Sequence, residues 1–118
     1  MINILANDGI SESAIDLLKD NGFNVTNEHI NQDSLVDSIN KNNYEVVLVR
    51  SATKIRKKLI DKCPCIKLIG RGGVGMDNID VEYAIDKGIK VINTPKSSSL
   101  SVAELVFAHL FGMVRFLY

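Results

Sequence analysis

Short apolar runs rich in Ile and Val alternate along the chain with segments whose apolar residues recur at helical spacing. Runs of four or five residues separated by amphipathic segments are typical of parallel βαβ units. The runs that fit strands are Ile2–Ala6, Phe23–Thr26, Val46–Arg50, Ile66–Gly70 and Lys90–Asn93. Between two of these runs, Leu35, Val36 and Ile39 lie three and four residues apart, as one face of a helix requires.

Glycine and aspartate residues between the runs predict where helices begin and end. Gly22 and Gly88 each fall where a helix should end in a left-handed residue before the next strand. Asp80 is predicted to be the N-cap of a helix from about Val81 to Lys87. This helix start leaves residues 70–79 as a loop.

The alternation predicts an α/β domain with a flavodoxin-like fold in three layers. Near-continuous apolar strands indicate a parallel sheet that is covered by helices on both faces. Right-handed crossovers then give a doubly wound, five-stranded parallel sheet with strand order 2-1-3-4-5. In such sheets ligands bind at the carboxyl ends of the strands.

Residues 101–118 differ from the earlier helical segments, because apolar residues occupy nearly the whole circumference of the predicted helix. A helix that is apolar all round must be buried all round, and a sheet with its own helices can cover only one side of it. We therefore divide the chain into a domain of residues 1–100 and a helix of residues 101–118 that packs on a further domain or partner chain. Glu104, His109 and Arg115 argue against a membrane as that partner.

Length, composition and charge restrict the class of protein. The 118 residues suffice for one domain, and 46% of them are hydrophobic, close to the globular average. Fourteen basic and fourteen acidic residues give a net charge of zero, which argues against nucleic acid as a partner. Because no basic and apolar leader or long apolar run is present, we expect a cytoplasmic protein.

Two cysteines and two histidines are the candidates for metal binding or nucleophilic catalysis. Cys63 and Cys65 are too close in sequence for an easy disulfide, and no second Cys pair or nearby His completes a zinc set. We expect two free thiols and no metal. His29 and His109 have no Ser, Cys or Asp at motif spacing and are predicted to be structural.

A glycine cluster, Gly70–Gly75, matches the pattern G-x-G-x-x-G after a predicted strand. In a dinucleotide fingerprint the helix opens within the glycines so that its N-terminus meets the pyrophosphate, whereas here Met76–Ile79 intervene. In such a fingerprint an acidic residue at the end of the next strand binds the ribose, and here that position is occupied by Asn93 and Thr94. We interpret the cluster as a turn whose bare backbone amides hold a small anion.

Arg50 and Ser51 end the neighbouring predicted strand and offer a charge and a hydroxyl to a carboxylate or phosphate. Arg71 could add a second charge. The alternative is that both arginines pair with local acids and the glycines merely turn the chain, and both interpretations stay open. Asn7–Asp8 half fits the acidic pair of a phospho-acceptor domain, but Arg50 stands where the acceptor Asp should be.

Four motifs in the same order resemble the N-terminal part of the D-isomer-specific 2-hydroxyacid dehydrogenases. They are Leu48–Lys54 (LVRSATK), Ile69–Asp80 (IGRGGVGMDNID), Gly88–Pro95 (GIKVINTP) and Ser99–Leu105 (SLSVAEL). Within that family they look like the branch that oxidises 3-phosphoglycerate to 3-phosphohydroxypyruvate in serine biosynthesis. The resemblance implies a flavodoxin-like substrate domain that is interrupted by an NAD-binding Rossmann domain, with the active site in the cleft between them.

The resemblance also implies which residues bind substrate. They are Arg50, Ser51, Thr53, Gly73, Val74 and Gly75. Arg50 and Ser51 would hold the substrate phosphate, and the backbone amides around Gly73, Val74 and Gly75 would hold the carboxylate beside the reacting carbon. Val74 occupies a position at which relatives touch the nicotinamide end of the cofactor, often with Thr, and valine lacks that hydroxyl.

In the family, the catalytic Arg, His and Glu and the true dinucleotide fingerprint come from later sequence, so no catalytic residue is named here. The resemblance therefore implies an N-terminal fragment of an NAD-dependent oxidoreductase, inactive by itself, whose partner is a small phosphorylated 2-hydroxy acid and whose full-length parent is a homodimer. The alternative from another class is a flavodoxin-like interaction module, whose exposed final helix docks on a partner or on itself without catalysis.

Overall fold

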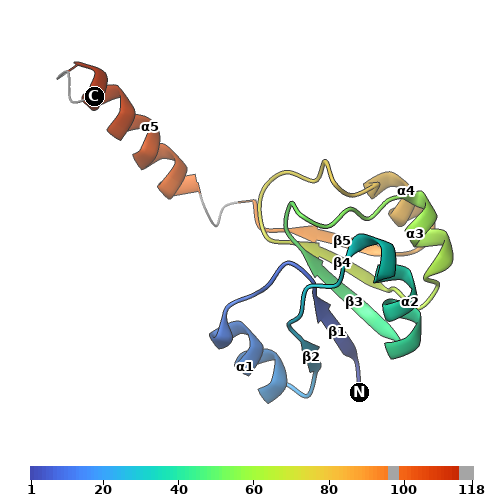
Figure 1. The fold of residues 1–118 in the computed structure, drawn as a ribbon. Helices are drawn as coiled ribbons and strands as arrows, with labels where there is room; N and C mark the ends of the chain where they lie inside the picture. Colours follow the sequence, from blue (N-terminus) through green and yellow to red (C-terminus); the bar gives the residue numbers. More distant parts are fainter. Residues whose placement is uncertain (96–98, 115–118) are drawn as a thin grey trace.

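One parallel sheet organises the computed structural model, which describes residues 1–95 and 99–114 (Figure 1). Its strands are β1 (Asn3–Ala6), β2 (Asn24–Thr26), β3 (Tyr44–Val49), β4 (Leu68–Arg71) and β5 (Lys90–Asn93). The strand order is β2-β1-β3-β4-β5, and every neighbouring pair is parallel. The predicted flavodoxin-like order is confirmed, and its switch point lies between β1 and β3.

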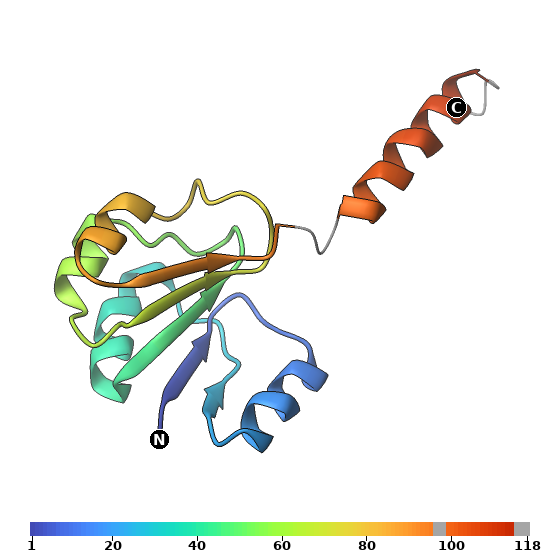
Figure 2. The same ribbon diagram turned by 180° about the vertical axis from the view of Figure 1, so that it is seen from behind.

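Helices lie on both faces of this sheet, which gives the predicted three layers (Figures 1 and 2). The helices are α1 (Glu12–Asp20), α2 (Gln32–Asn42), α3 (Lys57–Lys62), α4 (Val81–Asp86) and α5 (Ser99–Val114). In the figures α1 lies on one face, α2, α3 and α4 lie on the other, and α5 extends away from the sheet. No described helix therefore covers the α1 face of the sheet over β4 and β5.

The hydrophobic core lies between the central strands and the layer of α2, α3 and α4. Leu5, Val47 and Ile69 on β1, β3 and β4 are fully buried, and Leu35 and Ile39 of α2 join the same cluster. Burying each such side chain stabilises the fold by about 1.5–3 kcal/mol. This packing fixes the carboxyl ends of β1, β3 and β4 relative to one another.

The predicted helix ends and the predicted N-cap lie at the expected residues, but the N-cap side chain makes different hydrogen bonds from those expected. Gly22 and Gly88 have φ of 88° and 83°, the left-handed conformation predicted for them. Asp80 is the N-cap residue of α4, but its side chain does not cap that helix. Its carboxylate instead accepts hydrogen bonds from the Lys57 backbone N–H at 2.9 Å and from Arg56 Nη1 at 3.2 Å. Asp80 therefore ties the start of α4 to the start of α3.

The last helix, α5, begins two residues before the predicted start, and residues 115–118 lie outside the described residues. Several of its large apolar side chains are between 50% and 65% exposed: Leu105, Val106, Phe107, Leu110 and Met113. That a further domain or chain covers them stays a prediction. Among the helices that the structure describes, none has the length and apolar character needed to cross a membrane.

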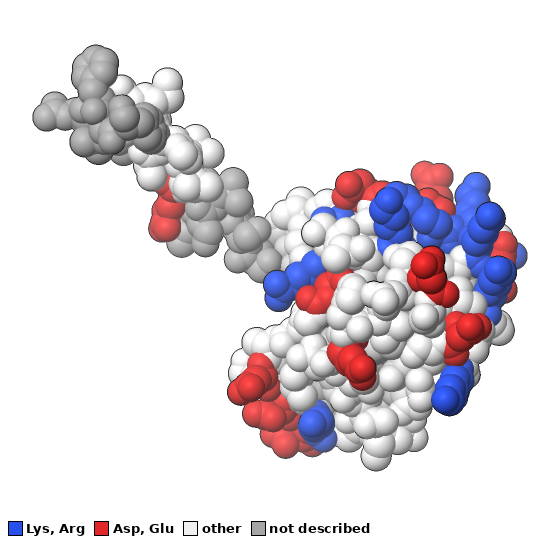
Figure 3. All heavy atoms as spheres, viewed as in Figure 1, with Lys and Arg blue, Asp and Glu red and all other residues white. Residues whose placement is uncertain are grey.

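Charged side chains are distributed without a dominant sign on the surface in Figure 3. Lys and Arg gather over α3 and α4, where acidic side chains lie among them. This mixture agrees with the net charge of zero.

The two cysteines are free thiols near the end of α3. Cys63 is fully buried, and burial raises the pKa of its thiol from its ordinary value to about 11, with a smaller contribution from the neighbouring Cys65. Above pH 9 the unfolded chain can therefore ionise this thiol while the folded chain keeps it neutral.

We expect the free energy of unfolding to fall between about pH 9 and 11, by up to about 2–3 kcal/mol, because the raised pKa stabilises the fold only below the unfolded pKa. Urea unfolding of the reduced chain at pH 8 and pH 10.5 measures this loss. Cys63→Ala is the control, since its loss over the same interval should be smaller by the contribution of this thiol. An equal loss in both chains would contradict the prediction.

Candidate functional site

A cavity of ≈ 340 Å³ opens at the carboxyl end of the sheet, beside the start of α1. Its lining comes from the loop after β1 and from the ends of β3, β4 and β5, and it includes Arg50, Arg71 and Gly72. This is the edge at which ligands bind in parallel sheets. Of the predicted site residues, Arg50 lines this cavity, whereas Ser51, Thr53 and Gly73–Gly75 lie outside its lining.

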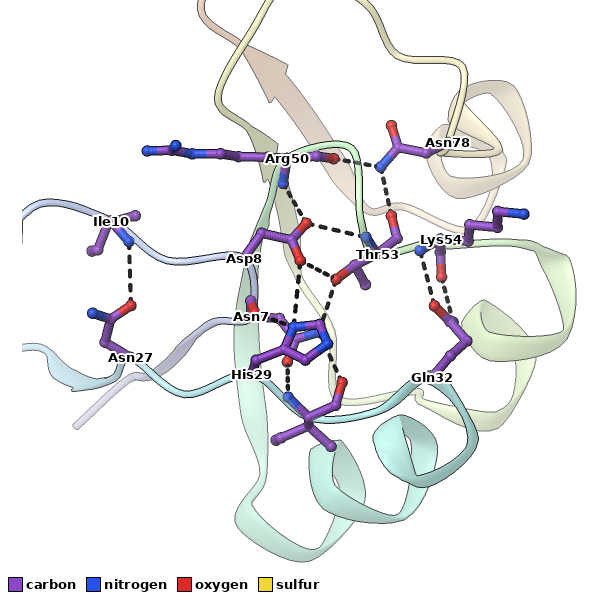
Figure 4. Close-up of polar contacts among 11 residues, drawn as sticks. Asn7, Asp8, Ile10, Asn27, His29, Gln32, Arg50, Thr53, Lys54 and Asn78 are labelled. Atoms are coloured by element: carbon purple, nitrogen blue, oxygen red, sulfur yellow. Dashed lines mark hydrogen bonds and ion pairs between the residues drawn. The ribbon is translucent and has the colours of Figure 1, made fainter.

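Arg50 is the first residue after β3, and its side chain reaches the cavity. In the described part of the chain, its guanidinium has no hydrogen bond or ion pair. A Cβ on Gly72 would lie 3.7 Å from Arg50 Cγ, so the Arg50 side chain runs along this glycine. Figure 4 shows the guanidinium pointing away from the polar network below it. Arg50 therefore offers its charge and its donors to a ligand.

Arg71 is in a different position, although it lines the same cavity. Its side chain is only 13% exposed, and Nη1 donates to Asp77 Oδ1 at 2.8 Å and to Asn78 Oδ1 at 2.6 Å. The hydrogen bond from Arg71 lowers the pKa of the Asp77 carboxyl. Of the two open interpretations, pairing with a local acid describes Arg71, whereas Arg50 has no such partner among the described residues.

The backbone of the loop after β3 is held from two sides (Figure 4). Asp8 Oδ2 accepts hydrogen bonds from the backbone N–H of Arg50 at 2.7 Å and of Thr53 at 3.1 Å. Asn78 Nδ2 donates to the carbonyl oxygens of Arg50 at 2.7 Å and of Thr53 at 2.6 Å. The segment between Arg50 and Thr53 therefore has a fixed path.

Ser51 and Thr53 were both predicted to bind substrate, and the structure places them differently. Ser51 is exposed in the loop, and within the described residues its hydroxyl has no hydrogen-bond partner. Thr53 is buried, with its hydroxyl donating to Asp8 Oδ1 at 2.6 Å and accepting from Asn7 Nδ2 at 2.8 Å. Thr53 thus supports the loop from below, and direct contact with substrate stays a prediction for it.

The glycine loop after β4 is tied to the end of β5. Gly73, with φ of 146°, donates its N–H to Thr94 Oγ1 at 2.7 Å, and the Thr94 N–H donates to Gly73 O at 3.0 Å. Asn93 Nδ2 donates to Val74 O at 3.0 Å. The amides of Val74 and Gly75 have no acceptor within the described residues. Two of the three predicted amide donors are therefore available, and that of Gly73 is used within the fold.

This loop does not fit the phosphates of a dinucleotide. No helix opens within Gly70–Gly75, since α4 begins only at Val81. The pyrophosphate of a dinucleotide needs a helix N-terminus directly after the glycines. The predicted helix start at Val81 is confirmed, and that the glycine pattern is not a dinucleotide fingerprint stays a prediction.

Three polar residues of the site were missed by the sequence interpretation: Asp8, Asn78 and Thr94. Asp8 had a detectable signal, because it lies two residues after the predicted strand Ile2–Ala6, but that signal did not indicate a role in holding the Arg50 loop. Asn78 and Thr94 gave no signal of this kind, since their partners lie 28 and 21 residues away and depend on the path of a loop.

Arg50 gives the cavity one positive charge that is unpaired within the described residues, in a lining that is otherwise largely apolar. The lining residues, all within the described part of the chain, include no His, Asp, Glu, Lys or Cys. General acid–base catalysis needs such a group within hydrogen-bond reach of the substrate. Arg50 can therefore attract an anion to the cavity.

We expect Gly73→Ala to lower the free energy of unfolding by about 1–2 kcal/mol, because a side chain is strained at φ of 146°. Amide NMR shifts should change at Val74 and Gly75 in the same variant. Gly72→Ala is the matched control, since its Cβ would meet Arg50 only at an ordinary contact distance of 3.7 Å. Equal stability of the two variants in urea unfolding would contradict the prediction.

Comparison with known proteins gives consistent similarities over nearly the whole chain. Residues 4–115 match the sequence model of the family described as "D-isomer specific 2-hydroxyacid dehydrogenase, catalytic domain". The chain is 41% identical over 115 residues to the D-3-phosphoglycerate dehydrogenase of Methanocaldococcus jannaschii, covering 98% of this chain and 22% of that protein. It is 42% identical over 110 residues to the hydroxypyruvate reductase of Thermotoga maritima, covering 92% and 35% respectively.

Among solved structures, the chain is similar to the NAD⁺-bound 3-phosphoglycerate dehydrogenase of Entamoeba histolytica. The TM-score is 0.76 at 28% identity, over 94% of this chain and 38% of that one. The chain therefore spans well under half the length of each of these three proteins.

Proposed function

The chain belongs to the D-isomer specific 2-hydroxyacid dehydrogenases, and on that basis we propose that it forms the substrate-binding part of an NAD-dependent D-3-phosphoglycerate dehydrogenase. The parent enzyme would oxidise 3-phosphoglycerate to 3-phosphohydroxypyruvate in serine biosynthesis, as a cytoplasmic homodimer. The observation that carries the proposal is the Arg50 guanidinium, which reaches the cavity without a protein partner among the described residues. Several relatives at 34–41% identity that are D-3-phosphoglycerate dehydrogenases support the same substrate.

The two ends of 3-phosphoglycerate match two groups of donors. The Arg50 guanidinium and the Ser51 hydroxyl bind the phosphate, since a guanidinium forms paired charge-assisted hydrogen bonds with phosphate oxygens. The amides of Val74 and Gly75 bind the carboxylate, and Thr53 supports the first loop from below. Holding both ends fixes the substrate carbon between the loops, which is the contribution of proximity and orientation to catalysis.

In the proposed enzyme, residues outside this chain carry out the proton transfer. Residues 1–100 form the substrate domain, and residues 101–118 form a helix that crosses to the NAD-binding domain. NAD, held outside this chain, would supply the hydride acceptor in the parent enzyme. Because the cavity lining has no acid–base group, we expect the 118-residue chain alone to bind substrate without oxidising it.

An amide NMR titration of the ¹⁵N-labelled chain tests the proposal. We expect 3-phosphoglycerate to shift Arg50–Thr53 together with Val74 and Gly75, because both loops contact the ligand. D-glycerate, which lacks the phosphate, should shift the glycine loop and leave the Arg50 loop unchanged. NAD alone should leave Gly70–Gly75 unchanged. A response to NAD at the glycines, or none to the phosphate ester, would contradict the assignment.

A second function is favoured by one specific observation, the exposed apolar side chains of α5, which include Leu110 and Met113. Such a surface suits an interaction module that docks on a partner or on itself without catalysis. In that case 3-phosphoglycerate would shift no amide, and the chain would self-associate in light scattering. Phe107→Glu should then restore a monomer.

A further inference from the structure

Two buried side chains hold the Arg50 loop without reaching the cavity. Asp8 follows β1 and accepts the backbone N–H of Arg50, while Asn78, in the loop after β4, donates to the Arg50 carbonyl (Figure 4). The Asp8 side chain is 4% exposed and Asn78 is 5% exposed. Neither residue belongs to the cavity lining, so neither is placed to touch a ligand there.

We propose that Asp8 is a positioning residue for anion binding and that Asn78 completes a clamp on the opposite side of the loop. The proposal rests on the proposed function, in which Arg50 and Ser51 bind the substrate phosphate. Asp8 accepts three hydrogen bonds from the loop: two from backbone N–H groups, and one from the Thr53 hydroxyl at 2.6 Å. The clamp fixes the Arg50 backbone, and the free guanidinium then faces the cavity.

Asn78 extends the clamp to the second arginine of the cavity. Its Nδ2 donates to the carbonyl oxygens of Arg50 and Thr53, and its Oδ1 accepts from Arg71 Nη1 at 2.6 Å. One buried amide therefore links the loops that follow β3 and β4. This link adds to two backbone hydrogen bonds between the same loops, from Ile55 N–H to Asn78 O and from Asp80 N–H to Ile55 O, both at 2.9 Å.

Neutralising Asp8 distinguishes a positioning role from a direct electrostatic effect on the bound anion. A carboxylate close to an anion site repels the anion, so Asp8 would weaken binding if only its charge mattered. An ordered loop has the opposite effect, because the ligand no longer has to order the side chains that bind it. The two roles predict opposite changes when Asp8 is neutralised.

Asp8→Asn and Asp8→Ala remove the same charge, but only Asn keeps an acceptor oxygen for the loop. We expect the dissociation constant for 3-phosphoglycerate, measured by NMR titration, to rise about threefold in Asp8→Asn and about tenfold or more in Asp8→Ala. Amide hydrogen exchange at Arg50 and Thr53 should accelerate in the same order. Asp16→Asn, which neutralises an exposed acid on α1, is the control and should change neither quantity.

If both Asp8 variants fold and bind as tightly as the wild-type chain or more tightly, the positioning role is overturned while the proposed function stands. If the wild-type chain does not bind the phosphate ester, the proposed function fails and the positioning role fails with it, and faster exchange at Arg50 and Thr53 then shows only that Asp8 orders the loop. If the Asp8 variants do not fold, Thr53→Val takes their place, since it removes one of the three donors. A threefold weaker dissociation constant then supports the proposal, and an unchanged one overturns it.

Discussion

Arg50→Ala is expected to weaken binding of 3-phosphoglycerate to the chain by at least about thirtyfold, because it removes the charged partner of the phosphate at a largely preformed site. The Arg50 backbone is fixed by Asp8 and Asn78, so the loop should keep its path when the side chain is shortened. The loss should therefore come from the missing guanidinium alone. Isothermal titration calorimetry or the amide titration measures it.

Two variants make this result specific. Arg50→Lys keeps the charge but loses the planar pair of donors, and we expect binding about tenfold weaker than in the wild-type chain. Lys54→Ala removes a positive charge four residues away, from a side chain that points away from Arg50 in Figure 4, and should change affinity less than about twofold. Equal effects of Lys54→Ala and Arg50→Ala would show a general charge effect and contradict the assignment.

Ile69→Ala is expected to lower the free energy of unfolding by about 3–4 kcal/mol, since it leaves a cavity in the centre of the core. Ile69 lies on β4, is fully buried, and belongs to the same cluster as Leu5, Val47 and Ile39. A domain of this size has a total stability of about 5–15 kcal/mol, so the variant should unfold at much lower urea concentration.

Ile92→Ala is the matched control on the neighbouring strand β5. Ile92 pairs in register with Gly70 and is 43% exposed on the sheet face that no described helix covers. We expect a loss of less than about 1 kcal/mol, because few of its contacts are buried. Similar losses in the two variants would mean that the uncovered face is packed in solution.

The strands were predictable because their signal is local. Lys90–Asn93 was predicted with the observed bounds, whereas β3 begins two residues before the predicted Val46, at Tyr44, outside the run of Val and Ile. The strand order followed from the right-handed crossover rule rather than from any residue. The position of α5 relative to the sheet could not be predicted from the sequence. The apolar pattern of this helix shows that its surface needs a partner, but it does not show which part of the protein or of another chain covers it.

The site was predictable in part for the same reason. Arg50 directly follows a strand, and the carboxyl ends of parallel strands meet at one edge, so its place could be inferred. Asp8 and Asn78 reach the Arg50 loop across 42 and 28 residues of sequence. Their backbone hydrogen-bond partners depend on the paths of the loops. Those paths cannot be predicted from residue spacing or from hydrophobic periodicity. The same limit applies to Gly73, whose N–H is taken by Thr94.

The strand order has a consequence for the nascent chain on the ribosome. Beyond β1, the sheet grows on one side in the order β3, β4, β5, which is also the order of synthesis. Each new strand can therefore pair with an edge that has already emerged. The Arg50 loop, however, lacks the hydrogen bonds from Asn78 until Asn78 has left the exit tunnel. We expect chains arrested before this residue to carry paired β1 and β3 strands with an Arg50 loop that is held by Asp8 alone.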